Sequence, residues 1–257
     1  MKKTLYLECY SGISGDMTVA ALLDLGADKT GLDAAVNSIK PLVSGFEVEV
    51  KRVQKSGIDA CDFNVILDKA HESHDHDMGY LHGHSHEHEA EHEHSQCHDT
   101  DHHHEHIGLS EITDVLNKAA LTDGARALAL KIFGILADAE AKAHRKPVNE
   151  VHFHEVGAVD SIVDIMSAAV CMDSLKTKHH ITDVVVSALY EGYGSVRCQH
   201  GILPVPVPAT ANIIEAYELP VHFMEVQGEF VTPTGAAIAA AVKTCLLYTS
   251  PSPRDRG

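Results

Sequence analysis

The chain has 257 residues and a formal net charge of −17, and 44% of its residues are hydrophobic but only 5% aromatic. This length and composition fit a globular protein with a substantial core and exclude a wholly disordered chain. Ten acidic residues and no Lys or Arg lie between His71 and His106. An acidic surface repels a phosphate backbone and attracts cations, so we expect no nucleic-acid partner.

The first part of the chain alternates strands and helices. A strand, a tight turn and a helix ending at Gly26 come first, then a helix stopped by Pro41 and two strands with period-two alternation. We predict these elements over Thr4–Cys9, Ser11–Asp16, Met17–Leu25, Leu32–Ile39, Phe46–Val50 and Cys61–Leu67. The two alternating strands are expected to form an antiparallel pair.

From about His71 to His106 no hydrophobic period survives, which predicts an inserted low-complexity loop. Beyond it, Ser110 is the expected cap of one helix, and a second helix runs from Thr122–Asp123 to about His144. A strand or strand end, a helix, a buried strand, a proline-rich edge and two more helices follow. They are predicted over Val151–Glu155, Asp160–Leu175, Ile181–Leu189, Leu203–Pro208, Ala209–Tyr217 and Ala236–Val242.

Strands that alternate with helices predict an α/β or α+β protein, in which helices pack on a mixed sheet and a disordered His-rich loop interrupts the core. The order of the strands stays open. We divide the chain into an N-terminal α/β part of the core (1–70), the insert (71–106), the remainder of the core (107–244) and a tail (245–257). The tail departs abruptly from the preceding helix and looks like translated adapter sequence. A genuine Pro- and Ser-rich terminus is the alternative.

The insert is a candidate metal-binding segment. It holds fourteen histidines, the first of which is His71. Neutral imidazole is a good ligand for Ni, Cu and Zn, and the interleaved carboxylates lower the cost of gathering dications. A solvated spacer or an expression tag is the alternative, although a tag is usually an unbroken terminal run. The predicted metal ligands are His74, His76, His82, His84, His86, His88, His92, His94, His98, His102, His103, His104 and His106.

A second group of imidazoles and carboxylates lies between Val151 and Asp164. Alternation in an extended segment places its two histidines on one face, and two aspartates four apart stack on a helix. Such a group would suit a dication or a metal-bound phosphate, and it does not match the H-E-x-x-H pattern of zinc proteases. The alternative is a set of satisfied core histidines with an aspartate that caps the helix. The predicted catalytic residues are His152, His154, Glu155, Asp160 and Asp164.

Two turns that precede helices are candidate cofactor-binding segments, because backbone N–H groups at such positions often face an anion. The alternative is a plain tight turn in which Asp16 caps the helix. The chain contains no G-x-x-x-x-G-K-[ST] motif, which counts against a P-loop nickel GTPase. The predicted cofactor-binding residues are Gly12, Ser14, Gly15, Asp16, Thr232, Thr234 and Gly235.

Cysteine usage and the chain start favour a reduced, cytoplasmic protein. The six cysteines are scattered with no C-x-x-C pair, so their spacing predicts no disulfide framework, although pairing by count stays open. The N-terminus starts basic but lacks the apolar run of a signal peptide. No segment approaches the roughly 18 uninterrupted apolar residues of a membrane span, so we expect no membrane partner.

Taken together, five segments in order resemble the pyridinium-bisthiocarboxylate mononucleotide nickel-insertion proteins, known as LarC. Five matches in one order are far more specific than any single match, and they reach from the chain start to about Val242. The segments are Leu5–Met17 (LYLECYSGISGDM), the insert, Val151–Ile165 (VHFHEVGAVDSIVDI), His200–Thr210 (HGILPVPVPAT) and Phe230–Ala237 (FVTPTGAA).

The resemblance implies a lyase-type metallochelatase that inserts Ni(II) between two thiocarboxylate sulfurs and a ring carbon of a pyridinium mononucleotide. It further implies CTP hydrolysis with a Mn or Mg ion, and the apoprotein of lactate racemase as recipient of the nickel-pincer cofactor. Soft sulfur donors suit Ni(II), and a nickel-rich loop raises its local concentration. The family carries a further C-terminal domain, associated with the nickel and CTP sites. We expect this chain to lack that domain and to need it for catalysis. A homo-oligomer is left open.

Two other classes of protein compete with this interpretation. A non-catalytic nickel or zinc buffer, or a metallochaperone, would use the core only to present the His-rich insert. A periplasmic zinc-binding protein would need a signal peptide. Binding of the pyridinium mononucleotide discriminates the first two interpretations, because an insertion enzyme must engage it and a buffer need not.

The composition of the insert generates one prediction. Because its many ligands are interchangeable, deletion of residues 73–105 should sharply reduce the number of nickel ions bound while the fold survives. Equilibrium dialysis measures the stoichiometry, and circular dichroism checks the fold. An unchanged stoichiometry would show that the insert does not buffer metal.

Overall fold

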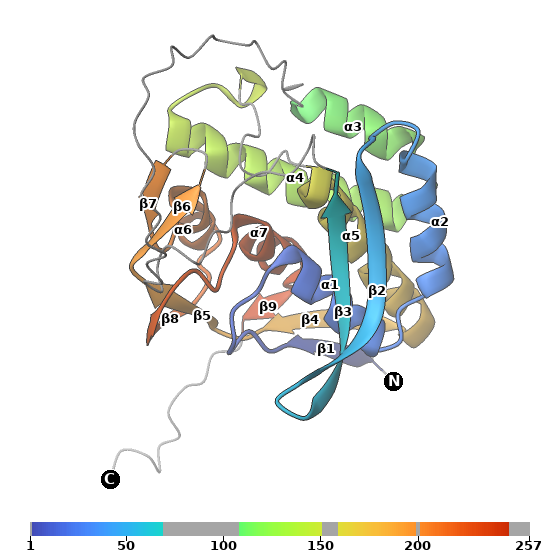
Figure 1. Ribbon diagram of the computed structural model, residues 1–257, viewed down its shortest axis with the longest axis horizontal. Helices are drawn as coiled ribbons and strands as arrows, with labels where there is room; N and C mark the ends of the chain where they lie inside the picture. Colours follow the sequence, from blue (N-terminus) through green and yellow to red (C-terminus); the bar gives the residue numbers. More distant parts are fainter. Residues whose placement is uncertain (1, 69–107, 151–158, 199–200, 247–257) are drawn as a thin grey trace, which may run out of the picture.

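The computed structural model describes residues 2–68, 108–150, 159–198 and 201–246. Its central sheet is parallel, with strand order β1 (Lys3–Leu7), β4 (Ile181–Val186) and β9 (Cys245–Leu246). Helices α1, α5 and α7 lie between this sheet and the long helix α4, as Figure 1 shows. One face of the sheet therefore packs on helices that begin near the carboxyl ends of its strands.

Three further pairs of strands lie outside the central sheet. β2 and β3 form an antiparallel hairpin, β6 and β7 form another, and β5 pairs in parallel with β8. Their bounds are β2 Phe46–Lys55, β3 Ile58–Leu67, β5 Leu189–Tyr193, β6 Ser195–Cys198, β7 Gly201–Pro204 and β8 Val221–Gln227. The predicted antiparallel pair and the mixed α/β class are confirmed. Within the described ranges, however, the strands are divided among four small sheets.

The predicted helices are all present, with small shifts at their ends. Their bounds are α1 Gly15–Asp24, α2 Lys29–Ile39, α3 Leu109–Lys118, α4 Asp123–His144, α5 Val159–His179, α6 Pro208–Ala216 and α7 Pro233–Val242. A short 3-10 turn, Val148–Glu150, follows α4. In the part of the chain that the structure describes, no helix is both long and apolar enough to cross a membrane.

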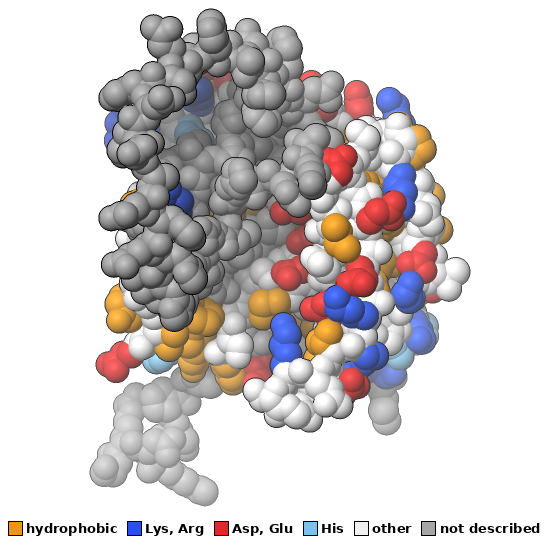
Figure 2. Space-filling model, viewed as in Figure 1, with side chains coloured by type: hydrophobic (Ala, Val, Ile, Leu, Met, Phe, Trp, Pro, Cys, Tyr) orange, Lys and Arg blue, Asp and Glu red, His pale blue; other side chains and the backbone are white. Residues whose placement is uncertain are grey.

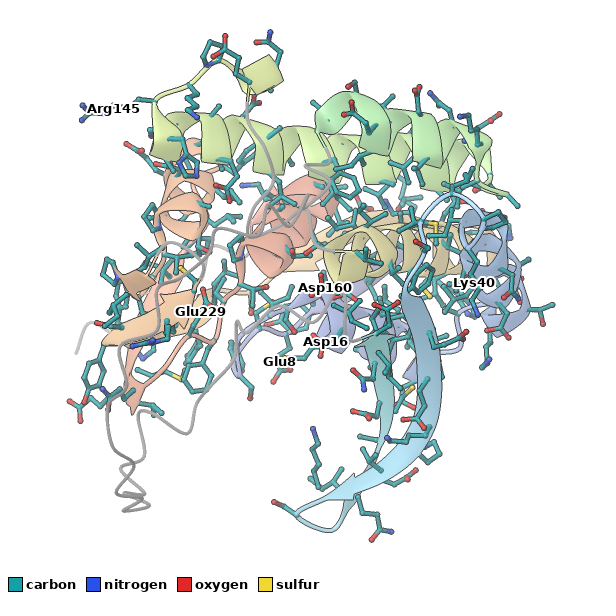
Figure 3. All side chains as sticks on the ribbon, turned by 45° about the horizontal axis from the view of Figure 1, so that its top comes forward. Glu8, Asp16, Lys40, Arg145, Asp160 and Glu229 are labelled. Carbon is teal, nitrogen blue, oxygen red and sulfur yellow. The ribbon has the colours of Figure 1, made fainter. Side chains whose placement is uncertain are left out.

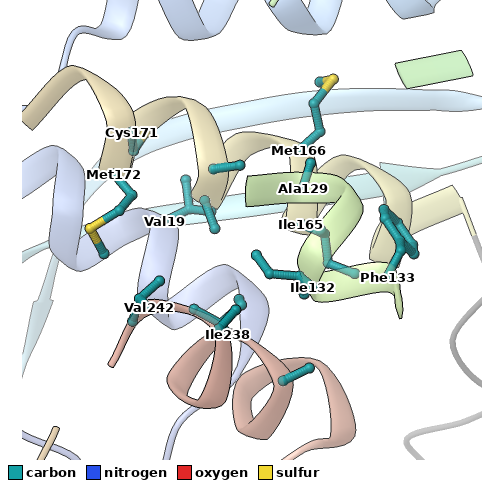
Figure 4. Packing of buried hydrophobic residues seen from close by; sticks show 14 of the residues in the cluster. Val19, Ala129, Ile132, Phe133, Ile165, Met166, Cys171, Met172, Ile238 and Val242 are labelled. Carbon is teal, nitrogen blue, oxygen red and sulfur yellow. The ribbon is translucent and has the colours of Figure 1, made fainter. Parts of the chain in front are cut away.

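The hydrophobic core lies where α1, α5 and α7 meet α4 (Figure 4). Val19, Ile132, Ile165 and Ile238, one from each of these helices, are each at most 1% exposed. Full burial of such a side chain contributes about 1.5–3 kcal/mol. α7 is buried from Thr234 to Val242, and its small alanines let its neighbours approach on every side. Its short length is therefore supported by packing on the core.

Helix starts follow from capping side chains, with one exception to the prediction. α4 starts where predicted, and the structure shows that Thr122 caps it, since the Thr122 Oγ1 accepts the Ala125 N–H over 3.1 Å. The predicted cap at Ser110 is wrong, because α3 begins after Gly108 and the Glu111 carboxylate accepts the Gly108 N–H over 3.0 Å. That carboxylate closes the turn without a side-chain oxygen at the cap position.

The predicted strand Ile181–Leu189 is divided into β4 and β5. At the break, the Ser187 N–H donates to the Leu7 carbonyl over 3.0 Å and the Ser187 Oγ accepts the Cys9 N–H over 2.8 Å. These hydrogen bonds therefore join the chain leaving β4 to the chain leaving β1.

The predicted tail begins with a short strand. Cys245–Leu246 form β9, and residues 247–257 lie outside the described residues.

Candidate functional site

The turn after β1 crosses the segment that enters α7. The Ile13 N–H donates to the Phe230 carbonyl over 2.9 Å, and the Thr232 N–H donates to the Ile13 carbonyl over 3.2 Å. The two bonds form a parallel bridge between Ile13 and Val231. The two turns that the sequence singled out, far apart in the chain, thus lie side by side.

Two glycines make this crossing possible. Gly12 has φ of +85°, and a Cβ at this position would lie 2.0 Å from the Phe230 carbonyl oxygen. A Cβ on Gly235 would lie 2.0 Å from the Ile13 carbonyl oxygen. Any side chain larger than hydrogen would push the two backbones apart. The glycines of both turns therefore serve close backbone approach.

The N-terminal amides of α1 and α7 are bonded within the protein. The Ser14 Oγ caps α1 by accepting the Met17 N–H over 3.4 Å, and the Ser14 hydroxyl donates to the Asp16 carboxylate. The interpretation in which Asp16 caps this helix is therefore wrong. The Asp16 N–H donates to the carboxylate of Asp164, so the anion at this helix end belongs to the protein. In the same way, the Thr232 Oγ1 caps α7.

Three carboxylates from two helices gather at this place. Asp160 lies in the first turn of α5 and Asp164 one turn later, which confirms the predicted spacing. Gly15 lets α1 approach closely, since a Cβ there would lie 2.5 Å from the Asp164 Oδ2. Figure 3 shows Asp16 beside the start of α5, near Asp160. The start of α5 thus joins the two turns in one site.

The environment of Asp164 opposes its negative charge. Burial raises its pKa well above the usual value, the charges of Asp16 and Asp160 raise it further, and the bond from the Asp16 N–H opposes them. Its Oδ1 is buried and has no hydrogen-bond partner among the described residues. Acidic side chains also gather along the middle of the face seen in Figure 2. Crowded carboxylates of this kind are typical of functional sites and favour a proton or a cation.

The described carboxylates do not by themselves form a site for a resident metal ion. No three His, Cys, Asp or Glu side chains within the four described ranges are arranged to hold one. The Ser14 hydroxyl, moreover, already engages the Asp16 carboxylate. Asp16, Asp160 and Asp164 therefore do not fit a bound Mn or Mg ion as a complete ligand set.

A family model described as nickel insertion protein matches residues 5–253, which include both turns, the start of α5 and all of α7. This chain belongs to the nickel insertion protein family. The match confirms the resemblance drawn from the five sequence segments. No solved structure matches the chain.

Three relatives of this nickel insertion family are each named pyridinium-3,5-bisthiocarboxylic acid mononucleotide nickel insertion protein. The relative from Alkaliphilus metalliredigens is 49% identical over 247 residues, which are 95% of this chain and 53% of the relative. Those from Clostridium acetobutylicum and Geobacillus kaustophilus are 48% and 39% identical, over 93% and 92% of this chain and 55% and 50% of the relatives. The chain spans about half the length of these relatives.

The predicted site residues of this family member have separate outcomes. The structure brings together the two turns and the aspartates of α5, while their roles in binding or catalysis stay predictions. The predicted catalytic residues His152, His154 and Glu155 and all thirteen predicted histidine ligands lie outside the described residues.

The sequence analysis missed Glu191 of β5, whose side chain is 0% exposed and bonds to the segment before α7. A lone carboxylate in a short apolar strand was the available signal.

The close approach at Gly235 generates a prediction. Gly235→Ala should lower the free energy of unfolding by about 2 kcal/mol, because its methyl group would overlap the Ile13 carbonyl. Gly134→Ala in α4 is the matched control, since a Cβ there meets nothing within 4 Å. This substitution should raise the free energy of unfolding by about 0.5–1 kcal/mol, because Ala favours the helix over Gly. Urea unfolding measures both values. Similar effects of the two substitutions would contradict the crossing.

The raised pKa of Asp164 gives a second prediction. Because the pKa is higher in the folded state, ionisation costs stability once the pH exceeds the unfolded pKa. Asp164→Asn should therefore stabilise the protein by about 1 kcal/mol at neutral pH, and the gain should shrink as the pH falls toward 4. Thermal unfolding across this range measures it. Asp33→Asn, on the exposed face of α2, is the control, and a pH-independent gain for Asp164→Asn would contradict the assignment.

Proposed function

We propose that this protein takes part in the insertion of nickel into pyridinium-3,5-bisthiocarboxylic acid mononucleotide, the compound in the names of its relatives. The observation that carries this proposal is the family match over residues 5–253. Within that match, three segments far apart in the chain meet at one place in the fold. Convergence of separate motifs is expected of a binding centre and not of a scaffold for a loop.

Nickel is the cargo of the proposed reaction, and the carboxylates would act on it. Asp160 and Asp164, with His152, His154 and Glu155 before them in the sequence, would draw Ni(II) toward the start of α5. The two crossing turns, Gly12–Asp16 and Thr232–Gly235, would border the mononucleotide. Its thiocarboxylate sulfurs would then bind the nickel ion, because soft sulfur donors suit Ni(II).

Further features of the proposed function come from the resemblance alone. They are a lyase-type reaction driven by CTP with Mn or Mg, a cytoplasmic location and transfer of the product to the apoprotein of lactate racemase. No step is assigned to a resident Mn or Mg ion, because the described carboxylates do not fit one.

A nickel or zinc buffer is the second candidate function. It is favoured by the fourteen histidines and ten acidic residues of the insert, which suit loose binding of several ions. Such a protein would bind metal whether or not the mononucleotide is present. Binding of the mononucleotide therefore distinguishes the two candidate functions.

The test is calorimetric titration of the chain with the mononucleotide, followed by Ni(II). We expect the mononucleotide to bind, and nickel then to produce the charge-transfer absorbance of nickel–sulfur bonds. Asp160→Asn should weaken nickel uptake by this complex about tenfold, which corresponds to about 1.4 kcal/mol. Asp33→Asn makes the same chemical change on the exposed face of α2 and should have no effect. Absence of mononucleotide binding by the unaltered chain would leave the buffer as its function.

A further inference from the structure

Glu191 is a fully buried carboxylate that holds the segment before α7. Its Oε1 accepts three backbone N–H groups, from Gly192 and Phe230 over 2.8 Å each and from Val231 over 3.3 Å. Phe230 is the residue whose carbonyl accepts the Ile13 N–H. A single side-chain oxygen thus fixes one side of the crossing between the two turns.

The same short stretch of chain holds the other side of the crossing. Ser187 and Tyr190, which precede Glu191 in the chain, both bond to Cys9. The Ser187 Oγ accepts the Cys9 N–H, and the Tyr190 N–H donates to the Cys9 carbonyl over 3.1 Å. Cys9 leads directly into the turn that contains Ile13. The stretch 187–191, which ends within β5, therefore bonds to both chains that meet at the site, and Glu191 makes its bonds to the α7 side.

Burial of the Glu191 carboxylate costs stability. Burial raises the pKa of Glu191, although the three N–H donors oppose that shift. The second oxygen, Oε2, is buried and has no hydrogen-bond partner among the described residues. An acceptor is needed at this position, because the three N–H groups would otherwise lose their partner, and a carboxylate adds the cost of a buried charge. Costs of this kind are commonly retained where a side chain fixes a functional site.

We propose that Glu191 is a positioning residue, whose acceptor oxygen Oε1 sets the register between the turn at Ile13 and the start of α7 and so shapes the mononucleotide site. The ligand part of this inference rests on the proposed function. The register part does not, because it concerns backbone hydrogen bonds alone. The two parts can therefore be tested separately.

Hydrogen exchange tests the register. Glu191→Ala should lower the protection of the Ile13 and Thr232 amides about tenfold or more, while amides of the β2–β3 hairpin stay unchanged. Glu191→Gln keeps an acceptor oxygen and should retain protection. Glu140→Ala removes another buried carboxylate, on α4, and should leave the Ile13 and Thr232 amides unchanged. Unchanged or uniformly lowered protection in Glu191→Ala would overturn the inference. Should that variant not fold, Glu191→Asp, one methylene shorter, takes its place.

Mononucleotide affinity tests the effect on the site. The dissociation constant for pyridinium-3,5-bisthiocarboxylic acid mononucleotide should rise about tenfold in Glu191→Ala and return to within about threefold in Glu191→Gln. A structural role alone would leave the affinity of the folded variant unchanged, and that result would overturn positioning of the ligand. If the unaltered chain does not bind the mononucleotide, the proposed function fails, while hydrogen exchange still decides the register.

Discussion

Ile13 donates one backbone hydrogen bond and accepts another from the segment that enters α7, and glycines on both sides let the two chains touch. α1 begins two residues after Ile13, and α7 begins just beyond Thr232. The crossing therefore sets where both helices start relative to each other. Both helices then pack against α5, whose first two turns carry Asp160 and Asp164. Displacement of this crossing would shift the starts of α1 and α7 relative to Asp160 and Asp164 on α5.

The crossing and its surroundings contain groups that oppose folding. Asp164 and Glu191 are carboxylates with raised pKa values, and each has a buried oxygen without a partner in the described ranges. Such costs persist only where the surrounding packing exceeds them. The fully buried side chains that join α1, α4, α5 and α7, such as Ile132 and Ile165, supply that packing directly behind the site. The core thus supports a local arrangement that would not be stable alone.

Local patterns predicted most of the helices, because caps and helix breakers act over a few residues. Thr122 is an example, since its hydroxyl and the N–H that it accepts are three residues apart. The partners of Ile13 could not be predicted, because a backbone hydrogen bond leaves no mark on the pattern of side chains. Glu191 was missed for a related reason. Phe230 and Val231, whose N–H groups donate to its side chain, lie about forty residues further along the chain. The division of β4 from β5 at Ser187 has the same long-range origin.

The start of α1 shows why a motif can identify a place without identifying its partner. Its amides were expected to face an external anion, but the Asp16 N–H faces Asp164 and the Met17 N–H faces Ser14. A phosphate that approached this end would also meet the charges of Asp16 and Asp160. A dication near these carboxylates would offset that repulsion. Under the proposed function, nickel and the anionic mononucleotide therefore favour each other's binding, and thermodynamic linkage makes this effect reciprocal.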